Sequence, residues 1–240
     1  MPAADDGEAH AASDAAEIAR RFTLSEQTVV LPDWSLALEK PRNSDDLISE
    51  ADYAKDERLP YWADLWRSAE ILSSYLITHR SQLLAAFGGA GRPRSLELGC
   101  GLGLVSIVAQ RVGFDALATD YYDDALLFVR HNARRALGAP IATRLVDWNA
   151  IPADLGQFEL LLGADLLYEM RYAGLLADVV ARTLAPEGVM LLGDQGRIGL
   201  QAFLGECEAR GLRHEVLHRE AAPVGEQRPS ITLYALRWRR

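Results

Sequence analysis

The sequence contains little cysteine and no pattern typical of a metal site. It has 2 cysteines and 5 histidines in 240 residues. Cys100 and Cys207 lack the spacing of a zinc site or of a disulfide framework, and the histidines are scattered along the chain. We therefore expect no structural metal and a reducing compartment.

Positive charge and long apolar segments are also scarce. The chain carries 25 Lys and Arg against 34 Asp and Glu, which gives a formal net charge of −9. Nucleic-acid affinity comes largely from basic side chains, so a nucleic-acid partner is disfavoured. No run approaches the ~18 apolar residues of a membrane span, and the acidic, Ala-rich start does not resemble a signal peptide. We expect a soluble cytoplasmic protein without membrane contact.

Apolar residues, by contrast, are abundant. They make up 49% of the chain, which is ample for a full hydrophobic core. The pattern predicts one domain over residues 59–240, preceded by an N-terminal extension over residues 1–58. The extension is expected to contain a frayed or partly helical tail (1–20), a strand or hairpin outside the main sheet (22–38) and a short helix capped by Asn43 or Ser44 (43–54).

From Pro60 onward, helical and strand patterns alternate. Aromatic and apolar residues recur at helical spacing from Trp62, which predicts a helix from Pro60 to about Thr78. The strands that follow are apolar throughout, as expected of a parallel sheet buried on both faces. The predicted strands cover 94–98, 115–120, 141–148, 158–165 and 188–194, and the predicted helices cover 102–112, 123–137, 172–184 and 199–210.

The end of the chain has a different pattern. Residues 212–220 and 230–240 are both strand-like, and only turn-forming residues separate them. They predict a terminal antiparallel hairpin. The predicted fold class is therefore α/β, a Rossmann-like doubly wound sheet of seven strands, mostly parallel, that ends in an antiparallel hairpin.

A glycine-rich turn follows the first strand of this sheet. The segment "SLELGCGLGLVS" spans residues 95–106 and leads into a helix, an arrangement that binds anions and nucleotides at the helix N-terminus. The dinucleotide fingerprint G-x-G-x-x-G would need a third glycine at Leu104, but it stands at Gly103. The dinucleotide fingerprint is therefore not met, and a dehydrogenase and a turn without any ligand are kept as alternatives.

The second strand ends in a carboxylate. Asp120 stands at its tip, where an acid can accept hydrogen bonds from both ribose hydroxyls of a nucleotide. An ordinary loop aspartate is the alternative. Asp123 directly precedes the next helix and is expected to be its N-cap.

The segment from Glu97 to Gly103 reads E-x-G-x-G-x-G and resembles motif I of the class I S-adenosylmethionine-dependent methyltransferases. The resemblance implies S-adenosylmethionine as cofactor, with S-adenosylhomocysteine as product, and Glu97 at the α-amino end of the cofactor. It also implies that Asp147 accepts from the adenine amine and that Trp148 packs on the ring. The residues expected to bind cofactor are Trp66, Glu97, Gly99, Cys100, Gly101, Gly103, Asp120, Tyr121, Asp147, Trp148 and Ala164.

The fourth strand ends in "LLGADLLYEMRY", residues 161–172. Asp165 and Tyr168 keep the acid and the aromatic residue of amino methyltransferases that act on bases or glutamine, but both prolines of that motif are missing. D-x-x-Y instead resembles the motif of the seven-strand protein lysine methyltransferases, a group that includes those acting on the electron transfer flavoprotein β subunit. Residues 59–76 and "GDQGR" (193–197) are similar to segments of the same group.

This resemblance implies a methyltransferase that modifies a lysine of a partner protein. Asp165 is expected to orient the neutral amine, and Tyr168 and Trp66 are expected to wall its channel. A salt bridge within a loop explains Asp194 and Arg197 nearly as well as a role in the site. A small-molecule N-methyltransferase and a cofactor-binding scaffold without catalysis are the alternatives on the same fold.

Overall fold

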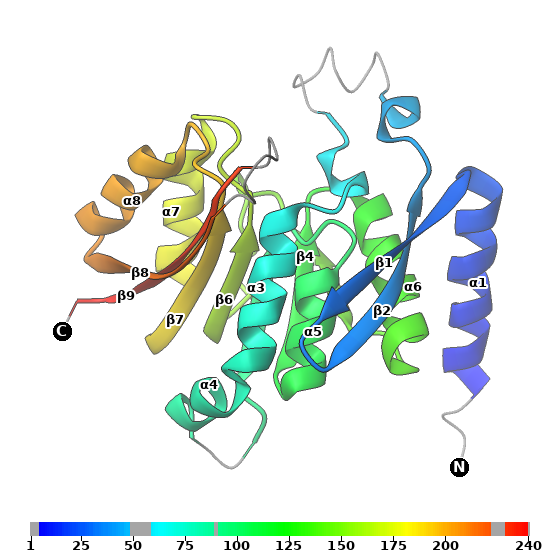
Figure 1. The fold of residues 1–240 in the computed structure, drawn as a ribbon, viewed down its shortest axis with the longest axis horizontal. Coiled ribbons are helices and arrows are strands. Elements are labelled where there is room, and N and C mark those ends of the chain that lie inside the picture. Colours follow the sequence, from blue (N-terminus) through cyan, green and yellow to red (C-terminus); the bar gives the residue numbers. More distant parts are fainter. Residues whose placement is uncertain (1–4, 49–58, 89–90, 222–228, 240) are drawn as a thin grey trace.

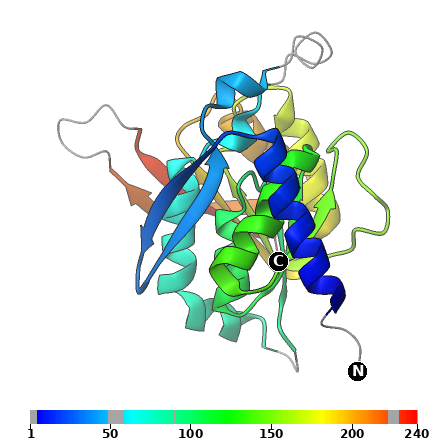
Figure 2. The ribbon, with the colours of Figure 1, turned by 90° about the vertical axis from the view of Figure 1, so that its right-hand side faces the viewer.

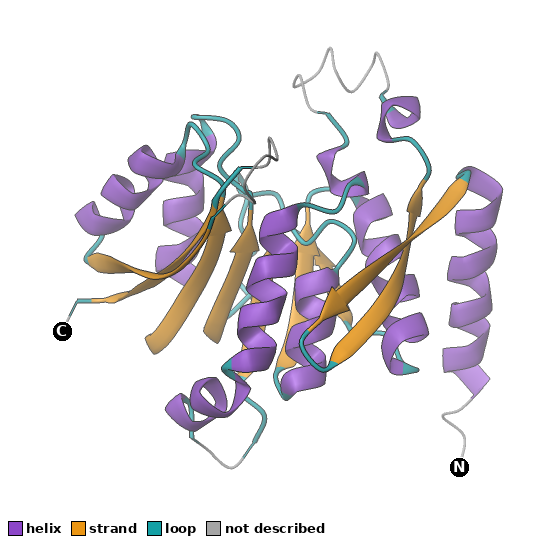
Figure 3. Ribbon diagram, in the orientation of Figure 1, coloured by secondary structure: helices purple, strands orange, loops and turns teal. Residues whose placement is uncertain are grey.

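A twisted seven-stranded sheet forms the centre of the molecule, with helices on both of its faces (Figures 1 and 3). The structure is a computed structural model that describes residues 5–48, 59–88, 91–221 and 229–239, with side chains from residue 13 onward. The strands of the main sheet are β3 (Arg94–Leu98), β4 (Asp115–Asp120), β5 (Ala142–Leu145), β6 (Phe158–Ala164), β7 (Leu184–Asp194), β8 (Leu212–Glu220) and β9 (Ile231–Trp238).

The strand order is β5-β4-β3-β6-β7-β9-β8. Neighbouring strands run parallel except at β9, which is antiparallel to both β7 and β8. The predicted α/β class, the seven strands and the C-terminal hairpin are thereby confirmed. Because β3 lies between β4 and β6, the chain direction across the sheet reverses there, and ligands of such sheets bind at the carboxyl ends of the strands beside this reversal.

The structure also contains a two-stranded sheet and several helices outside the main sheet. A separate antiparallel pair is formed by β1 (Leu24–Leu31) and β2 (Trp34–Pro41), which confirms the hairpin expected outside the main sheet. The helices are α1 (Asp5–Arg21), α3 (Arg67–Thr78), α4 (Arg80–Ala86), α5 (Leu104–Val112), α6 (Asp123–Leu137), α7 (Tyr172–Thr183) and α8 (Leu200–Ala209), with 3-10 turns η1 (Ser44–Leu47) and η2 (Tyr61–Ala63).

Each face of the sheet has its own apolar core. Alternate residues of a strand point to opposite faces, so Leu160 and Leu162 join one core whereas Leu161 joins the other. The first core contains residues of α3, α5, α6 and the β1–β2 hairpin, and the second contains residues of α7 and α8. Strands buried on both faces explain why the sequence is apolar along their whole length.

The N-terminal segment, expected to be a frayed or partly helical tail, forms the helix α1 from Asp5 to Arg21. Figure 2 shows α1 lying along the outside of α6. Asp14 accepts from Arg130 Nε at 3.2 Å and also pairs with Arg134. These ion pairs link the start of the chain to the helix that follows β4. No helix among the described residues is both long and apolar enough to cross a bilayer.

Several helix boundaries differ from the predictions; α5, for example, begins at Leu104 and not at Leu102. The helix expected from Pro60 begins only at Arg67, because the chain forms the turn η2 and is then extended at Asp64, which has φ −108° and ψ 147°. Asp123 is the first residue of α6 and not its N-cap, which is Tyr122. The short helix after Asn43 is the 3-10 turn η1, with Asn43 as its N-cap; residues 49–54 of that prediction lie outside the described residues.

One buried amide joins the hairpin, α6 and the glycine turn. Asn132 is fully buried, and its Oδ1 accepts from the Glu39 backbone N–H at 2.9 Å. Its Nδ2 donates to the carbonyl of Glu39 at 3.1 Å and to that of Leu102 at 3.2 Å. A single side chain therefore supports the loop that follows β3 from the side of the N-terminal hairpin.

Replacing this amide should destabilise the whole chain. Asn132→Ala leaves three backbone groups without their partner, which should lower the free energy of unfolding by roughly 2–4 kcal/mol. Urea unfolding followed by circular dichroism measures the change. The control on the same helix is Arg135→Ala, whose exposed ion pairs to Glu26 and Glu39 should contribute less than about 1 kcal/mol. Equal stability of the two variants would contradict the role given to Asn132.

Candidate functional site

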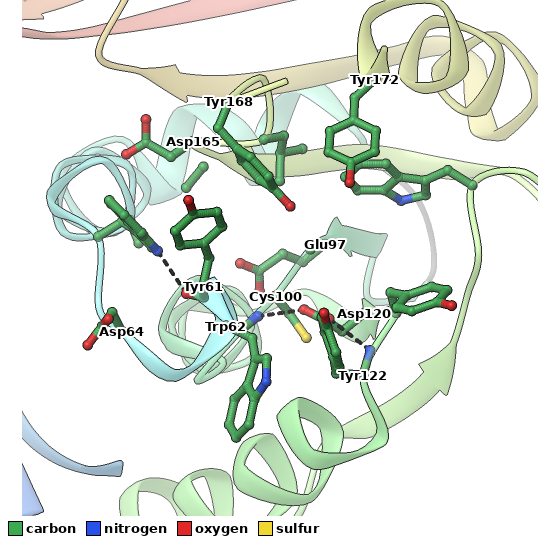
Figure 4. Close-up of a pocket in the computed structure, with 18 of the residues that line it drawn as sticks. Tyr61, Trp62, Asp64, Glu97, Cys100, Asp120, Tyr122, Asp165, Tyr168 and Tyr172 are labelled. Carbon is green, nitrogen blue, oxygen red and sulfur yellow. Dashed lines mark hydrogen bonds between the residues drawn. The ribbon is translucent and has the colours of Figure 1, made fainter. Parts of the chain in front are cut away.

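A pocket of about 650 Å³ opens at the carboxyl ends of the strands, beside the reversal of strand order. Figure 4 shows Tyr61, Tyr168 and Asp165 on one side of it and Cys100, Asp120 and Tyr122 on the other. Of the thirteen residues predicted for the site, twelve line this one pocket, and Gly103 does not. The twelve are Trp66, Glu97, Gly99, Cys100, Gly101, Asp120, Tyr121, Asp147, Trp148, Ala164, Asp165 and Tyr168.

The glycine turn gives the pocket its floor. Gly99 has φ +61° and Gly101 has φ +51°, conformations that strain any residue with a side chain. A Cβ atom at Gly99 would stand 2.8 Å from Leu166 Cδ2, and one at Gly101 would stand 3.1 Å from the Trp62 carbonyl oxygen. Both positions therefore require glycine for close approach as well as for backbone conformation.

Gly103 is not among the residues that line the pocket, and its predicted role in cofactor binding stays a prediction. It is the N-cap of α5, with φ +86°, and a Cβ atom there would stand 2.9 Å from Val129 Cγ2 of α6. Close packing between the helices α5 and α6 explains this glycine without any ligand. The E-x-G-x-G-x-G pattern thus combines two glycines that shape the pocket with one that allows helix packing.

Glu97 lies buried at the end of β3, with only 3% of its surface exposed. Its Oε2 accepts from the Ser106 backbone N–H at 2.8 Å and also from the Ser106 hydroxyl. Burial, with a smaller contribution from the nearby Asp120 charge, raises the pKa of Glu97 from its usual value near 4.5 to about 8, although the Ser106 hydrogen bonds oppose the shift. The carboxylate is oriented by α5 and also lines the pocket.

Asp120 holds the glycine turn to the end of β4. Its Oδ2 accepts from Gly101 N–H at 3.0 Å, and its Oδ1 accepts from Tyr122 N–H at 3.1 Å. Burial raises the pKa of Asp120, and the backbone donors partly offset this. The side chain is therefore both a structural clamp and a buried acid on the pocket wall.

The end of β5 supplies a more open part of the wall. Asp147 Oδ1 accepts from the backbone N–H and the side-chain Nδ2 of Asn149, each at 2.9 Å. Trp148 packs edge-to-face on Tyr172 with ring centroids 5.4 Å apart. Asn149 and Tyr172 also line the pocket but were not predicted, because neither stands in a motif that marks a site.

Aromatic side chains form the other end of the pocket. Tyr61 contacts Tyr168 with ring centroids 5.1 Å apart and Trp66 at 5.9 Å. The Trp66 indole N–H donates to the carbonyl of Tyr61 at 3.0 Å, which fixes the ring. Sequence reasoning missed Tyr61, which the turn η2 brings to the pocket; its only signal was the cluster of aromatic residues before the predicted helix.

Asp165 follows β6 with its backbone strained to φ +55°. Its Oδ2 accepts from Ser68 Oγ at 2.5 Å, and its Oδ1 accepts from Arg197 Nε at 3.2 Å. Arg197 also lies over the Trp66 ring, with Cζ 4.9 Å from the centroid. Arg197 thus lines the site as well as forming a salt bridge, whereas Asp194 shapes the loop by accepting from Arg197 N–H at 2.8 Å.

The charges of the pocket are strongly unequal. Six carboxylates line it against a single cation, Arg197, among the described lining residues. The acids are Asp64, Glu97, Asp120, Asp147, Asp165 and Glu169. No group of three or more His, Cys, Asp or Glu residues suited to a metal ion occurs in the part of the chain that the structure describes. Asp64 and Glu169 pair with Lys40 and Arg171 outside the lining, and the remaining excess of acids suits ligands that carry positive charge.

Comparison with known proteins assigns the chain to a family. Residues 53–204, more than half of the sequence, match the lysine methyltransferase family. The chain belongs to this family. Its members share with this protein the region from just before η2 to the middle of α8, which contains every residue predicted for the site.

Two curated relatives and one solved structure illustrate the likeness. The electron transfer flavoprotein beta subunit lysine methyltransferase of Xenopus laevis is 32% identical over 140 residues, 58% of this chain and 53% of that protein. Protein N-lysine methyltransferase METTL21A of Mus musculus is 34% identical over 112 residues, 44% of this chain and 48% of that protein. The chain spans about half the length of the curated relatives it matches.

The solved structure is a magnesium protoporphyrin IX methyltransferase from Synechocystis with bound S-adenosylmethionine. It has a TM-score of 0.53 and 15% identity, and the likeness covers 80% of this chain and 94% of that chain. At this identity the likeness concerns the fold alone. It agrees with the Rossmann-like methyltransferase architecture expected from the strand order.

The pocket residues of this family member fit S-adenosylmethionine. The volume of about 650 Å³ is within the range of small-molecule sites. Glu97 and Asp120 line the pocket with buried carboxyl groups, which suit a ligand with an ammonium, a sulfonium and ribose hydroxyls. Asp147 and Trp148 would lie at its adenine end.

The raised pKa of Glu97 predicts a pH dependence of stability. Between about pH 4.5 and 8 the folded protein holds a proton that the unfolded chain has lost, so the free energy of unfolding falls as the pH rises through this window. Glu97→Gln cannot titrate and lacks this decrease. Its stability relative to wild type should therefore rise with pH and level off above about pH 8.

Urea unfolding of both proteins between pH 5 and pH 9 measures this difference. The titration of all other groups is common to the two proteins and cancels when their free energies are subtracted. A difference that is constant across the pH range would contradict the raised pKa of Glu97.

Proposed function

We propose that this protein is an S-adenosylmethionine-dependent N-methyltransferase that modifies a lysine side chain of a partner protein. The observation that carries the proposal is one pocket with two unlike ends. Glycines and the buried acids Glu97 and Asp120 form one end, and Asp165 lies with the rings of Tyr61, Trp66 and Tyr168 at the other. The first end suits the cofactor, and the second suits a cationic side chain.

S-adenosylmethionine supplies, when bound, a methyl group on a sulfonium sulfur that a correctly aligned neutral amine can attack. The residues proposed to hold it are Glu97 at the α-amino group, Asp120 at the ribose hydroxyls, and Asp147 with Trp148 at the adenine. Because Gly99 and Gly101 carry no side chain, the backbone can pass directly beneath the cofactor.

The acceptor end would bind, orient and desolvate the lysine. The aromatic walls exclude water, and desolvation lowers the pKa of an amine toward the neutral form that reacts. Asp165 would accept a hydrogen bond from the amine and align its lone pair. An aromatic face also tolerates the cation that forms as the methyl group is added.

The acceptor class rests on charge. Six acids against one cation in the lining favour a basic acceptor and do not favour the phosphates of a nucleic acid. The curated relatives described above are named as lysine methyltransferases of protein substrates, which further supports a protein lysine. We also propose the cytoplasm as the compartment, supported by two free cysteines. A small-molecule amine is the second candidate acceptor.

Asp120 should contribute directly to cofactor binding. Asp120→Ala removes the proposed hydrogen bonds to the ribose and the hydrogen bond to Gly101 N–H. The free energy of binding S-adenosylmethionine should therefore become less favourable by about 1–3 kcal/mol. Isothermal titration calorimetry measures this free energy. Asp115→Ala, at the exposed opposite end of β4, is the matched control and should bind as wild type does. Equal affinities for the two variants would remove Asp120 from the cofactor site.

Transfer itself is tested with a cofactor labelled on its methyl group. Wild-type protein is incubated with a cell lysate and, separately, with an extract of small metabolites, and labelled lysine in protein bands is the expected result. Label confined to small molecules would replace the protein acceptor by the second candidate. Cofactor binding without any transfer would favour a scaffold, and binding of NAD alone would reject the methyltransferase proposal.

Asp165→Asn should reduce transfer by about 100-fold through loss of amine alignment, while the affinity for S-adenosylmethionine stays close to wild type. The amide keeps the size of the side chain and an acceptor for Ser68. Asp178→Asn, on α7 and half exposed, is the control for loss of one negative charge. Unchanged turnover of Asp165→Asn would show that another group orients the acceptor.

A further inference from the structure

Arg197 reaches the acceptor end of the pocket from a fixed turn after β7. Asp194 Oδ1 accepts from the backbone N–H groups of Gly196 at 2.6 Å and Arg197 at 2.8 Å, and Gly196 has φ +85°. These contacts involve only the backbone of residues 196 and 197. The turn is therefore held independently of where the Arg197 side chain lies.

The guanidinium group of Arg197 makes two contacts. Its Nε donates to Asp165 Oδ1 at 3.2 Å, and its Cζ lies 4.9 Å from the centroid of the Trp66 ring. A carboxylate and an aromatic face are the two groups that bind an ammonium ion most favourably. They are also the groups that the proposed function gives to the acceptor lysine.

Each oxygen of Asp165 already accepts one hydrogen bond in this arrangement. Ser68 Oγ donates to Oδ2 at 2.5 Å, while Arg197 Nε donates to Oδ1, and the Asp165 side chain is only 3% exposed. Because the carboxylate is buried, an entering ammonium group gains room beside it when one of these two neighbours moves. The neighbours are Ser68, which is buried in α3, and Arg197.

Arg197 is the partner that can yield. Its side chain is 25% exposed and is joined to Asp165 by one hydrogen bond, not by a bidentate pair. Because the guanidinium group reaches solvent, it can be rehydrated when another cation takes its place beside Asp165. Ser68, by contrast, is fully buried beside Gly193 of β7.

We propose that Arg197 occupies the place of the acceptor cation and that the entering lysine displaces it. The inference rests on the proposed function, because it takes the acceptor to be a lysine side chain. Arg197 is then a specificity-determining residue: a cationic side chain can replace both contacts that Arg197 loses, whereas a neutral acceptor cannot. The residue favours basic acceptors by exchange and without touching the bound lysine.

The test measures binding of a lysine side-chain analogue without any turnover. n-Butylammonium is titrated into the protein saturated with S-adenosylhomocysteine, and its dissociation constant is obtained by ligand-observed NMR. Arg197→Gln removes the competing cation, so the dissociation constant should fall by about three- to tenfold, the range expected for one partly exposed ion pair with a cation–π contact. Arg197→Lys keeps a cation there and should bind as wild type does.

Arg210→Gln is the matched control. Arg210 pairs with Asp178 at 2.8 Å and with Glu206 at 2.5 Å, and none of the three is among the residues that line the pocket, so its loss changes the net charge equally. Its dissociation constant for n-butylammonium should equal that of wild type. Equal tightening in Arg210→Gln and Arg197→Gln would assign the effect to overall charge and overturn the proposal.

Weaker or unchanged binding of n-butylammonium by Arg197→Gln would also overturn it. Urea unfolding checks that the variant is folded, and Arg197→Met is measured in parallel as a second uncharged variant. Where a protein acceptor has been identified, its KM should fall by the same factor while the dissociation constant of S-adenosylmethionine stays unchanged. If wild type methylates no protein, the proposed function fails, and the binding measurement still decides whether Arg197 holds a cation site.

Discussion

Two backbone N–H groups, those of Gly101 and Tyr122, donate to the carboxylate of Asp120, and the shape of the pocket depends on these hydrogen bonds. They join the turn after β3 to the end of β4, where the Cys100 N–H also donates to the Thr119 carbonyl at 2.9 Å. The turn is thereby held in left-handed conformations that only glycine adopts easily, and the space above it stays open. A strand order that reverses at β3 places this opening at the one edge where several loops converge.

Without a bound ligand, the burial of Glu97 close to Asp120 is electrostatically unfavourable. Glu97 and Asp120 are both buried, both have raised pKa values, and the charge of Asp120 adds to the shift of Glu97. Burying two ionisable acids close together costs folding free energy. The ionised acids become favourable when a positively charged ligand enters, so the strain in the free protein and the preference for a cationic ligand have one cause.

Much of this could be predicted from the sequence, and the errors have physical reasons. The central strands are apolar on both faces, so the fold could be predicted from their sequence. Gly99 and Gly101 mark places where no side chain fits, so the position of the glycine turn at the pocket could be predicted as well. Trp62 and Trp66 stand four residues apart, as on one helix, but Trp62 lies in the turn η2 and Trp66 precedes α3. The predicted helix start was wrong here because residue spacing does not show where the chain bends. The contacts of Tyr61 and Arg197 come from loops that meet only in the folded chain. The division of the chain between residues 58 and 59 stays a prediction.

Asn132 gives the N-terminal hairpin a structural task at a distance. The sequence similarity to the family begins at residue 53, after Glu39, whose backbone pairs with Asn132. A fragment that starts at residue 53 would contain every residue of the pocket, yet it would leave this buried amide with Leu102 alone. The region of sequence similarity is therefore smaller than the hydrogen-bonded framework that supports the pocket. The N-terminal hairpin lies outside that region, yet it stabilises the loop after β3 through Asn132.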